Sequence, residues 1–370
     1  MYRKTAAMTA LVPPEVIYTC GWRAMDINNG IPASLAHPRS KLCAWTASWR
    51  EAIVKGQIRP DALIVVAGGD CHNALADGQV AARKVPAAHF FFYPFDGDAG
   101  YLKEQIGALE GFLCGEGSEE GRAGHSEMPR TSVRGRSRYR ALKPCRSRRG
   151  EERRPKGEES GPDKRVLSCI SEAKKLGMEL DRARSDGKAD PEGTFKTLIS
   201  FSDLEGSPSG FKERVKRTLD AETRKGRRQE RAEWPRVALI GVPPIYRDFH
   251  RTCAEAGLHV VFDELPFEFL RLGGKNIDEL ARNYSTYTFA RPVDFRLDFL
   301  KRELAKRRID GIVHYTQFTC HHILEDGLFR QELDWPMLTV QGDMPGETPA
   351  QIRLRLEAFG ELLGSDGRTK

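Results

Sequence analysis

The sequence DALIVVAGGDCHN, residues 61–73, decides the fold. Its apolar run, residues 62–66, is short and unbroken, which is typical of a strand buried on both faces in a parallel sheet. The glycine pair after it permits a tight turn, and Asp70 is expected to cap the helix that follows. Cys71 would then lie at a helix N-terminus, where open α/β sheets bind ligands and where a thiolate is stabilised. A small buried cysteine in a turn explains this stretch equally well.

Strands and helices alternate on both sides of this stretch. In the N-terminal half, we expect residues 1–12 to be a loose lead-in, 42–53 a helix, 89–93 a strand and 101–113 a helix. In the C-terminal half, the expected strands are 236–241, 258–263, 310–315 and 336–340, with helices at 245–256, 293–308, 321–332 and 348–363. This order predicts an α/β protein with two flavodoxin-like or Rossmann-like lobes, each built on a parallel sheet.

The composition changes sharply in the middle of the chain. Residues 115–165 contain 15 Lys and Arg against 9 Asp and Glu, so they account for +6 of the formal net charge of +7. They have almost no large aliphatic residues, and we expect them to be disordered because they cannot bury enough apolar surface. A nucleic-acid-binding arm is disfavoured because the segment has no repeated motif and almost no aromatic residues that could stack on bases. We predict an N-terminal lobe at 1–114, the basic segment at 115–165, a helical linker at 166–234 and a C-terminal lobe at 235–370.

The spacing of the eight cysteines limits which metal or disulfide sites are possible and which cellular compartment is expected. They lie far apart with no close pair, which argues against a zinc ribbon and against a disulfide scaffold. No apolar run has the length of a signal peptide core or a membrane span. We therefore expect a cytoplasmic protein whose thiols are available for metal or redox chemistry.

A second cysteine repeats the position of Cys71. The expected strand 310–315 ends in a polar loop, and Cys320 comes directly before the next helix. Cys71 and Cys320 would therefore occupy equivalent places in two strand–helix units. If the lobes face each other, both thiols meet at a shared cleft.

Several stretches, taken in order, resemble the 2-hydroxyacyl-CoA dehydratase D-component family, which is related to benzoyl-CoA reductase subunits and double-cubane cluster proteins. The matching stretches are 14–18, 26–29, 42–45, 69–73, 237–246, 310–315 with Cys320, and 342–359. The resemblance covers most of the chain outside the basic segment.

The resemblance implies a 4Fe-4S cluster held by Cys43, Cys71 and Cys320 from two flavodoxin-like lobes. Three thiolates on four irons leave one iron open for the thioester carbonyl of a 2-hydroxyacyl-CoA. One electron would then form a ketyl radical that expels the hydroxyl group and loses a β-proton, giving a 2-enoyl-CoA. The resemblance further implies a homologous sister subunit and an ATP-dependent activator protein that delivers the electron.

The remaining candidates are weaker. His72, His321 and His322 flank the proposed ligands and could supply a hydrogen bond or a proton, although a structural role fits each of them as well. Cys20 and Cys253 are expected in the core, whereas Cys114, Cys145 and Cys169 lie in or beside the basic segment. The residues that transfer protons are not identified. Two alternatives stay open, namely a related electron-transfer or acyl-CoA reductase subunit, and a non-catalytic α/β relative whose cysteines are structural.

Overall fold

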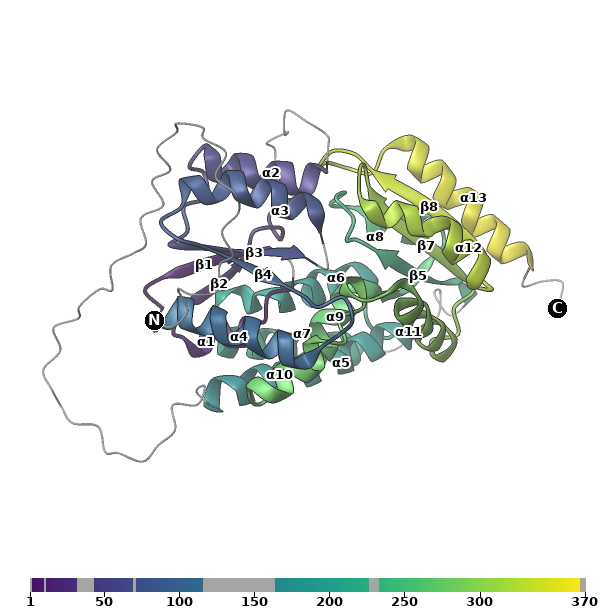
Figure 1. The fold of residues 1–370 in the computed structure, drawn as a ribbon. Coiled ribbons are helices and arrows are strands. Elements are labelled where there is room, and N and C mark those ends of the chain that lie inside the picture. Colours follow the sequence, from purple (N-terminus) through teal and green to yellow (C-terminus); the bar gives the residue numbers. More distant parts are fainter. Residues whose placement is uncertain are drawn as a thin grey trace, which may run out of the picture.

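The computed structural model describes residues 2–9, 11–31, 43–68, 71–115, 164–225 and 233–366 (Figure 1). Most of the segment predicted to be disordered, residues 116–163 of 115–165, lies outside the described residues, but its last two residues were predicted wrongly, since Lys164 and Arg165 begin the helix Lys164–Ser185. Gly69 and Asp70, and Leu42 in the predicted helix 42–53, also lie outside the described residues.

The first sheet consists of four parallel strands from the N-terminal part of the chain. They are β1 (Thr5–Met8), β2 (Arg23–Asp26), β3 (Ala62–Gly68) and β4 (Ala88–Phe92), in the order β2-β1-β3-β4. The expected loose lead-in at residues 1–12 is therefore wrong, because β1 is a central strand whose Ala6, Ala7 and Met8 are fully buried. Four residues, Thr-Ala-Ala-Met, are too short a run to show a hydrophobic period, so this strand could not be recognised from the sequence.

The second sheet repeats the first. Strands β5 (Arg236–Gly241), β6 (His259–Asp263), β7 (Gly311–Gln317) and β8 (Met337–Gly342) are parallel and lie in the order β6-β5-β7-β8. In each lobe the chain starts in a central strand, moves to one side, and returns to the other side of that strand. The predicted α/β class with two parallel-sheet lobes is confirmed.

Helices cover both faces of the sheets, so a hydrophobic core forms on each face, between the sheets and the helices that cover them. Side chains of Leu63 and Val65 on β3 pack with α2 (Ala44–Val54) and α3 (His72–Ala81). The alternate side chains, Ile64 and Val66, face the opposite layer with α1 (Pro14–Thr19) and α4 (Ala99–Cys114). In Figure 1, α2 and α3 lie above the first sheet and α1 and α4 below it. A run of apolar residues that alternates between two cores is what a doubly covered parallel strand requires.

The segment between the lobes is helical and lies against both of them. It begins with α5 (Lys164–Ser185), α6 (Pro191–Ile199) and α7 (Pro208–Lys225), and α5 packs on α1, α6, α7, α9 (Glu264–Arg271) and β6. The helix α10 (Ile277–Tyr284) packs on α4 of the other lobe. Neither α9 nor α10 was predicted, and α7 of the predicted helical linker packs on α5.

Three further helices complete the C-terminal lobe, and some predicted starts are corrected. They are α8 (Phe249–Glu255), α11 (Val293–Lys306) and α13 (Ala350–Asp366). The helix expected from residue 245 begins at Phe249, after a loop that contains two prolines. The helix expected at 321–332 starts as a 3-10 turn, His321–Glu325, and continues as α12 (Asp326–Glu332).

A buried ion pair ties the N-terminal lobe to the helical segment. The Nζ atom of Lys174 on α5 lies 2.7 Å from a carboxylate oxygen of Glu15 on α1, and Tyr284 on α10 donates to the other oxygen at 2.9 Å. The lobes are therefore joined by packed and charged contacts rather than by a flexible tether. In the part of the chain that the structure describes, no helix is both long and apolar enough to cross a membrane.

Candidate functional site

A cavity of about 570 Å³ opens at the carboxyl ends of the central strands of both sheets. Thr9 follows β1 and Cys71 follows β3 in the first lobe, whereas Val242 follows β5 and Cys320 follows β7 in the second. These are the topological switch points, where neighbouring connections leave in opposite directions and open a crevice for a ligand. The volume lies within the range of about 300–1,000 Å³ that is usual for ligand cavities.

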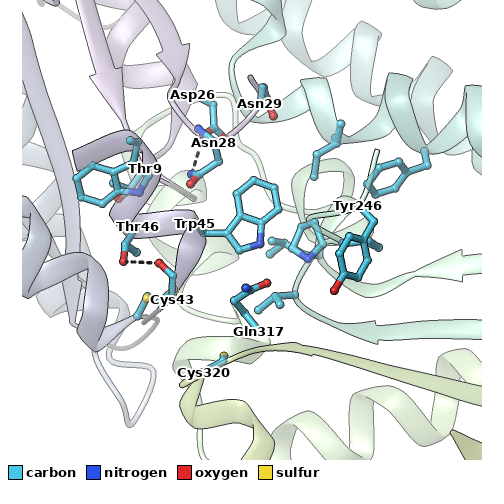
Figure 2. A pocket seen from close by; sticks show the side chains of 18 of the residues that line it. Thr9, Asp26, Asn28, Asn29, Cys43, Trp45, Thr46, Tyr246, Gln317 and Cys320 are labelled. Atoms are coloured by element: carbon cyan, nitrogen blue, oxygen red, sulfur yellow. Dashed lines mark hydrogen bonds between the residues drawn. The ribbon is translucent and has the colours of Figure 1, made fainter. Parts of the chain in front are cut away.

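Cys43 lies where the two lobes touch. It precedes α2 with a left-handed backbone, φ 44°, and its N–H donates to the carbonyl of Phe318 at 3.1 Å and to Oγ1 of Thr319 at 2.9 Å. Thr319 is also left-handed, with φ 66°. Residues other than glycine rarely adopt this conformation, and when held in it they cluster at functional sites. Figure 2 shows Cys43 and Cys320 at the same end of the cavity.

Cys71 and Cys320 each end a strand–helix connection, as predicted. Cys71 is itself the N-cap of α3, and its Sγ accepts the N–H of Ala74 at 3.4 Å. The predicted cap, Asp70, is therefore displaced by one residue. Cys320 is buried before the 3-10 turn, and its N–H donates to the carbonyl of Gln317 at 2.8 Å. A bond of 3.3 Å from the amide of Asn73 to the carbonyl of Thr319 links the two connections.

All three proposed ligand cysteines line this cavity, although they are 28 and 249 residues apart along the chain. Among the described residues, no group of three or more His, Cys, Asp or Glu side chains converges as ligands of a single metal ion. A cluster places a different demand on its ligands, because each thiolate binds a different iron and the sulfurs stand around the cluster. All three thiols line this one cavity, as ligands of a shared cluster would have to.

Burial has the largest effect on the pKa of Cys43, the cysteine at the contact between the lobes. It raises the pKa of the Cys43 thiol, and hydrogen bonds from Thr46 and Asn73 offset part of the rise. Iron binding to Cys43 would therefore have to displace the proton of its thiol.

Of the three histidines that flank the proposed ligands, two line the cavity and one does not. His321 and His322 line the cavity, whereas the ring of His72 lies 5.4 Å from that of His321 and is not part of the wall. Burial, followed by the neighbouring His322 and His72, lowers the pKa of His321 to about 4. His322 is buried with its Nδ1 atom 3.1 Å from Arg296.

Sequence reasoning missed the polar side chains that face the cavity. The indole Nε1 of Trp45 and the Oε1 of Gln317 are buried and have no hydrogen-bond partner within the described residues. Figure 2 shows the Trp45 ring between Asn28 and Gln317, with Tyr246 beyond it. Buried polar groups are rarely left without partners, so these two atoms are unsatisfied groups in the wall, and they would reach a ligand only after a small shift of their side chains. Gln317 ends β7, and that position at a strand end is the only sequence signal it carries.

The mouth of the cavity is basic. Lys196 on α6 and Arg247 line it with exposed side chains that pair with Glu192 at 2.6 Å and Glu347 at 2.8 Å. Arg251 also lines it, is exposed, and has no carboxylate partner in the described part of the chain.

The other described cysteines lie away from the cavity. Cys253 is fully buried in α8, as expected, and burial raises the pKa of its thiol. Cys20 is half-buried, with its Sγ 3.8 Å from the carbonyl of Glu110. Cys114 is exposed and Cys169 is half-buried, whereas Cys145 lies outside the described residues.

A comparison with protein families matches more than half of the chain to a known family. The model of the 2-hydroxyglutaryl-CoA dehydratase D-component matches residues 164–363, which include the helical segment, the second sheet and Cys320. A comparison with curated proteins found no match.

Proposed function

The chain belongs to the 2-hydroxyglutaryl-CoA dehydratase D-component family and is thus a component of a 2-hydroxyacyl-CoA dehydratase, and from this premise we propose that it is the subunit that carries a 4Fe-4S cluster. The cluster would be held by Cys43, Cys71 and Cys320. The proposed reaction is the reductive elimination of water from a 2-hydroxyacyl-CoA to give a 2-enoyl-CoA.

One observation carries the proposal: thiols from both lobes line a single cavity at the switch points of both sheets. When bound, a 4Fe-4S cluster with three protein thiolates supplies a low-potential electron and one open iron. Cys43 and Cys320 are held by a direct contact between the lobes, so the ligand set depends on the two lobes staying together.

The walls of the cavity support a thioester substrate. Aromatic side chains, among them Trp45, Phe195 and Phe289, exclude water from the interior. After a small side-chain shift, the Trp45 N–H would donate to a carbonyl or carboxylate oxygen and Gln317 Oε1 would accept from a hydroxyl group, since neither atom has a partner among the described residues. A 2-hydroxyacyl thioester presents both kinds of group on adjacent atoms.

The basic mouth suits the other end of such a substrate. Coenzyme A carries several phosphate charges, and exposed guanidinium and ammonium groups bind phosphate through charge-assisted hydrogen bonds. Arg251 is available for this contact without breaking an ion pair, whereas Lys196 and Arg247 would exchange their carboxylate partners. We place the acyl group inside and the nucleotide at the mouth.

The family implies that the chain works with a sister subunit. We propose in addition that an ATP-dependent activator delivers the electron, because a thioester is hard to reduce and hydrolysis supplies the driving force. The test uses the full chain with its sister subunit, reconstituted anaerobically with iron and sulfide, and with the activator, ATP and a reductant.

The measured quantity is 2-enoyl-CoA formed from 2-hydroxyglutaryl-CoA and from shorter and branched 2-hydroxyacyl-CoAs. We expect turnover with at least one of them, at least 100-fold less with Cys71→Ser, and full turnover with the control Cys20→Ser. A cluster-containing complex that accepts electrons but forms no enoyl-CoA from any of these thioesters would contradict the dehydratase proposal and favour a related reductase.

A further inference from the structure

A buried histidine on α8 faces the cavity from the second lobe. His250 is 4% exposed, lines the cavity, and stacks on the ring of Phe195 with centroids 4.0 Å apart. Phe195 belongs to α6, so the imidazole is fixed between two elements. The family match and the cysteine pattern assign it no role.

A buried carboxylate binds the Nε2 atom of this imidazole. The Nε2 atom of His250 lies 2.7 Å from Oδ1 of Asp263, the last residue of β6, which is 1% exposed. The other oxygen of Asp263 accepts a hydrogen bond from Arg184, whose guanidinium is fully buried and also binds Asp181 at 2.5 Å. Burial alone would raise the pKa of Asp263, but His250 and Arg184 outweigh it and hold that pKa below its usual range.

This arrangement decides which ring nitrogen carries the proton. An ionised carboxylate only accepts hydrogen bonds, so Nε2 is protonated and Nδ1 of the neutral ring keeps its lone pair. The contact with Asp263 uses Nε2, and no hydrogen bond from a described residue to Nδ1 is present. Because His250 lines the cavity, Nδ1 is the ring nitrogen left to meet a ligand there. A histidine whose far nitrogen is held by a buried aspartate is the geometry of a general base.

We propose that His250, positioned by Asp263, is the residue that transfers protons to and from the substrate in this cavity. This inference rests on the proposed dehydratase function. The C–H bond at the β-carbon breaks and its proton moves to Nδ1, while the C–O bond at the α-carbon breaks and a carbon–carbon double bond forms. The imidazolium then gives the proton to the departing hydroxide, and water leaves. The overall step is redox-neutral, since the electron that starts it is returned.

The first test needs no cluster and no turnover. Two-bond ¹H–¹⁵N correlation spectra of the ¹⁵N-histidine-labelled chain report the tautomer of each imidazole, and His250→Gln assigns the signal. We expect the Nε2–H tautomer for His250, and its replacement by a mixed or Nδ1–H signal in Asp263→Asn. A His250 signal with Nδ1 protonated in the wild type would overturn the inference.

The second test measures turnover of the reconstituted complex. Loss of a general base reduces rates by about 10²–10⁴-fold. We expect His250→Gln and His250→Ala to lower kcat at least 100-fold with KM changed less than threefold, and added imidazole to restore His250→Ala at least tenfold. His89→Gln is the control, because His89 on β4 is also partly buried but does not line the cavity.

The outcomes separate the two claims. A wild-type complex that turns over, with His250→Gln within threefold of it, overturns the role of His250 and leaves the dehydratase proposal standing. A wild-type complex that forms no enoyl-CoA contradicts the dehydratase proposal, and the proton-transfer role falls with it whatever tautomer is observed.

Discussion

Replacing Arg296 on α11 with methionine should destabilise the protein by about 3–5 kcal/mol, because the change leaves a buried carboxylate without its counter-ion. The Arg296 side chain is 1% exposed and binds both carboxylate oxygens of Glu264, at 2.7 and 2.8 Å. Glu264 is fully buried, and it also accepts a hydrogen bond from the N–H of Gly241, at 2.8 Å. Arg296 also binds Glu325, which is 23% exposed and can turn to water.

The free energy of unfolding follows from urea titrations read by far-ultraviolet circular dichroism. The control is Lys301→Met on the same helix, since Lys301 and Glu332 form an exposed pair, 43% and 47% accessible, worth less than about 1 kcal/mol. The double variant Arg296→Met/Glu264→Gln should recover more than 1 kcal/mol of the loss, because no charge is then left buried. The reasoning is refuted if Arg296→Met unfolds within 1 kcal/mol of the wild type, or if the double variant is no more stable than the single one.

Two further predictions concern the first lobe. A Cβ atom at Gly78 on α3 would lie 2.7 Å from a methyl group of Val65, so Gly78→Ala should destabilise the protein by about 1–3 kcal/mol. A Cβ atom at Gly107 on α4 meets nothing within 4 Å, so Gly107→Ala should stabilise the protein by up to about 1 kcal/mol. Equal urea midpoints of unfolding for the two variants would contradict this. Burial lowers the pKa of His89 from 6.5 to about 4, so below pH 6.5 the unfolded chain takes up a proton that the folded chain refuses. The free energy of unfolding should therefore fall between pH 6.5 and 4 more steeply in the wild type than in His89→Phe. Urea titrations at pH 7.5 and 5 measure this loss, and an equal loss in the two proteins would contradict the prediction.

The strands of the second lobe could be predicted because their apolar runs are continuous. Residues 236–241 were predicted with the bounds that β5 has. Strand β1 was missed because Thr5–Met8 has no large aliphatic residue, and its burial depends on neighbours that pair with it from residues 23–26 and 62–64. Local pattern decides an element only when the element is long enough to show a period.

The candidate site divides in the same way. The positions of Cys71 and Cys320 at strand ends are local features and were predicted, whereas the place of Cys43 beside Thr319 depends on how the lobes dock and came from the family resemblance. His250 was read as part of an ordinary helix. Its partner Asp263 ends a strand, but the pairing with Arg184 joins residues 79 apart and leaves no trace in a local pattern.

The most direct test of the account is the iron and acid-labile sulfide content of the anaerobically reconstituted chain, measured with its electron paramagnetic resonance spectrum after reduction. The account predicts about four irons and four sulfides per chain with a 4Fe-4S signal. It also predicts loss of most of that iron in each of Cys43→Ser, Cys71→Ser and Cys320→Ser, and full retention in Cys20→Ser. Iron content that is the same in the wild type and in the three ligand variants would contradict it.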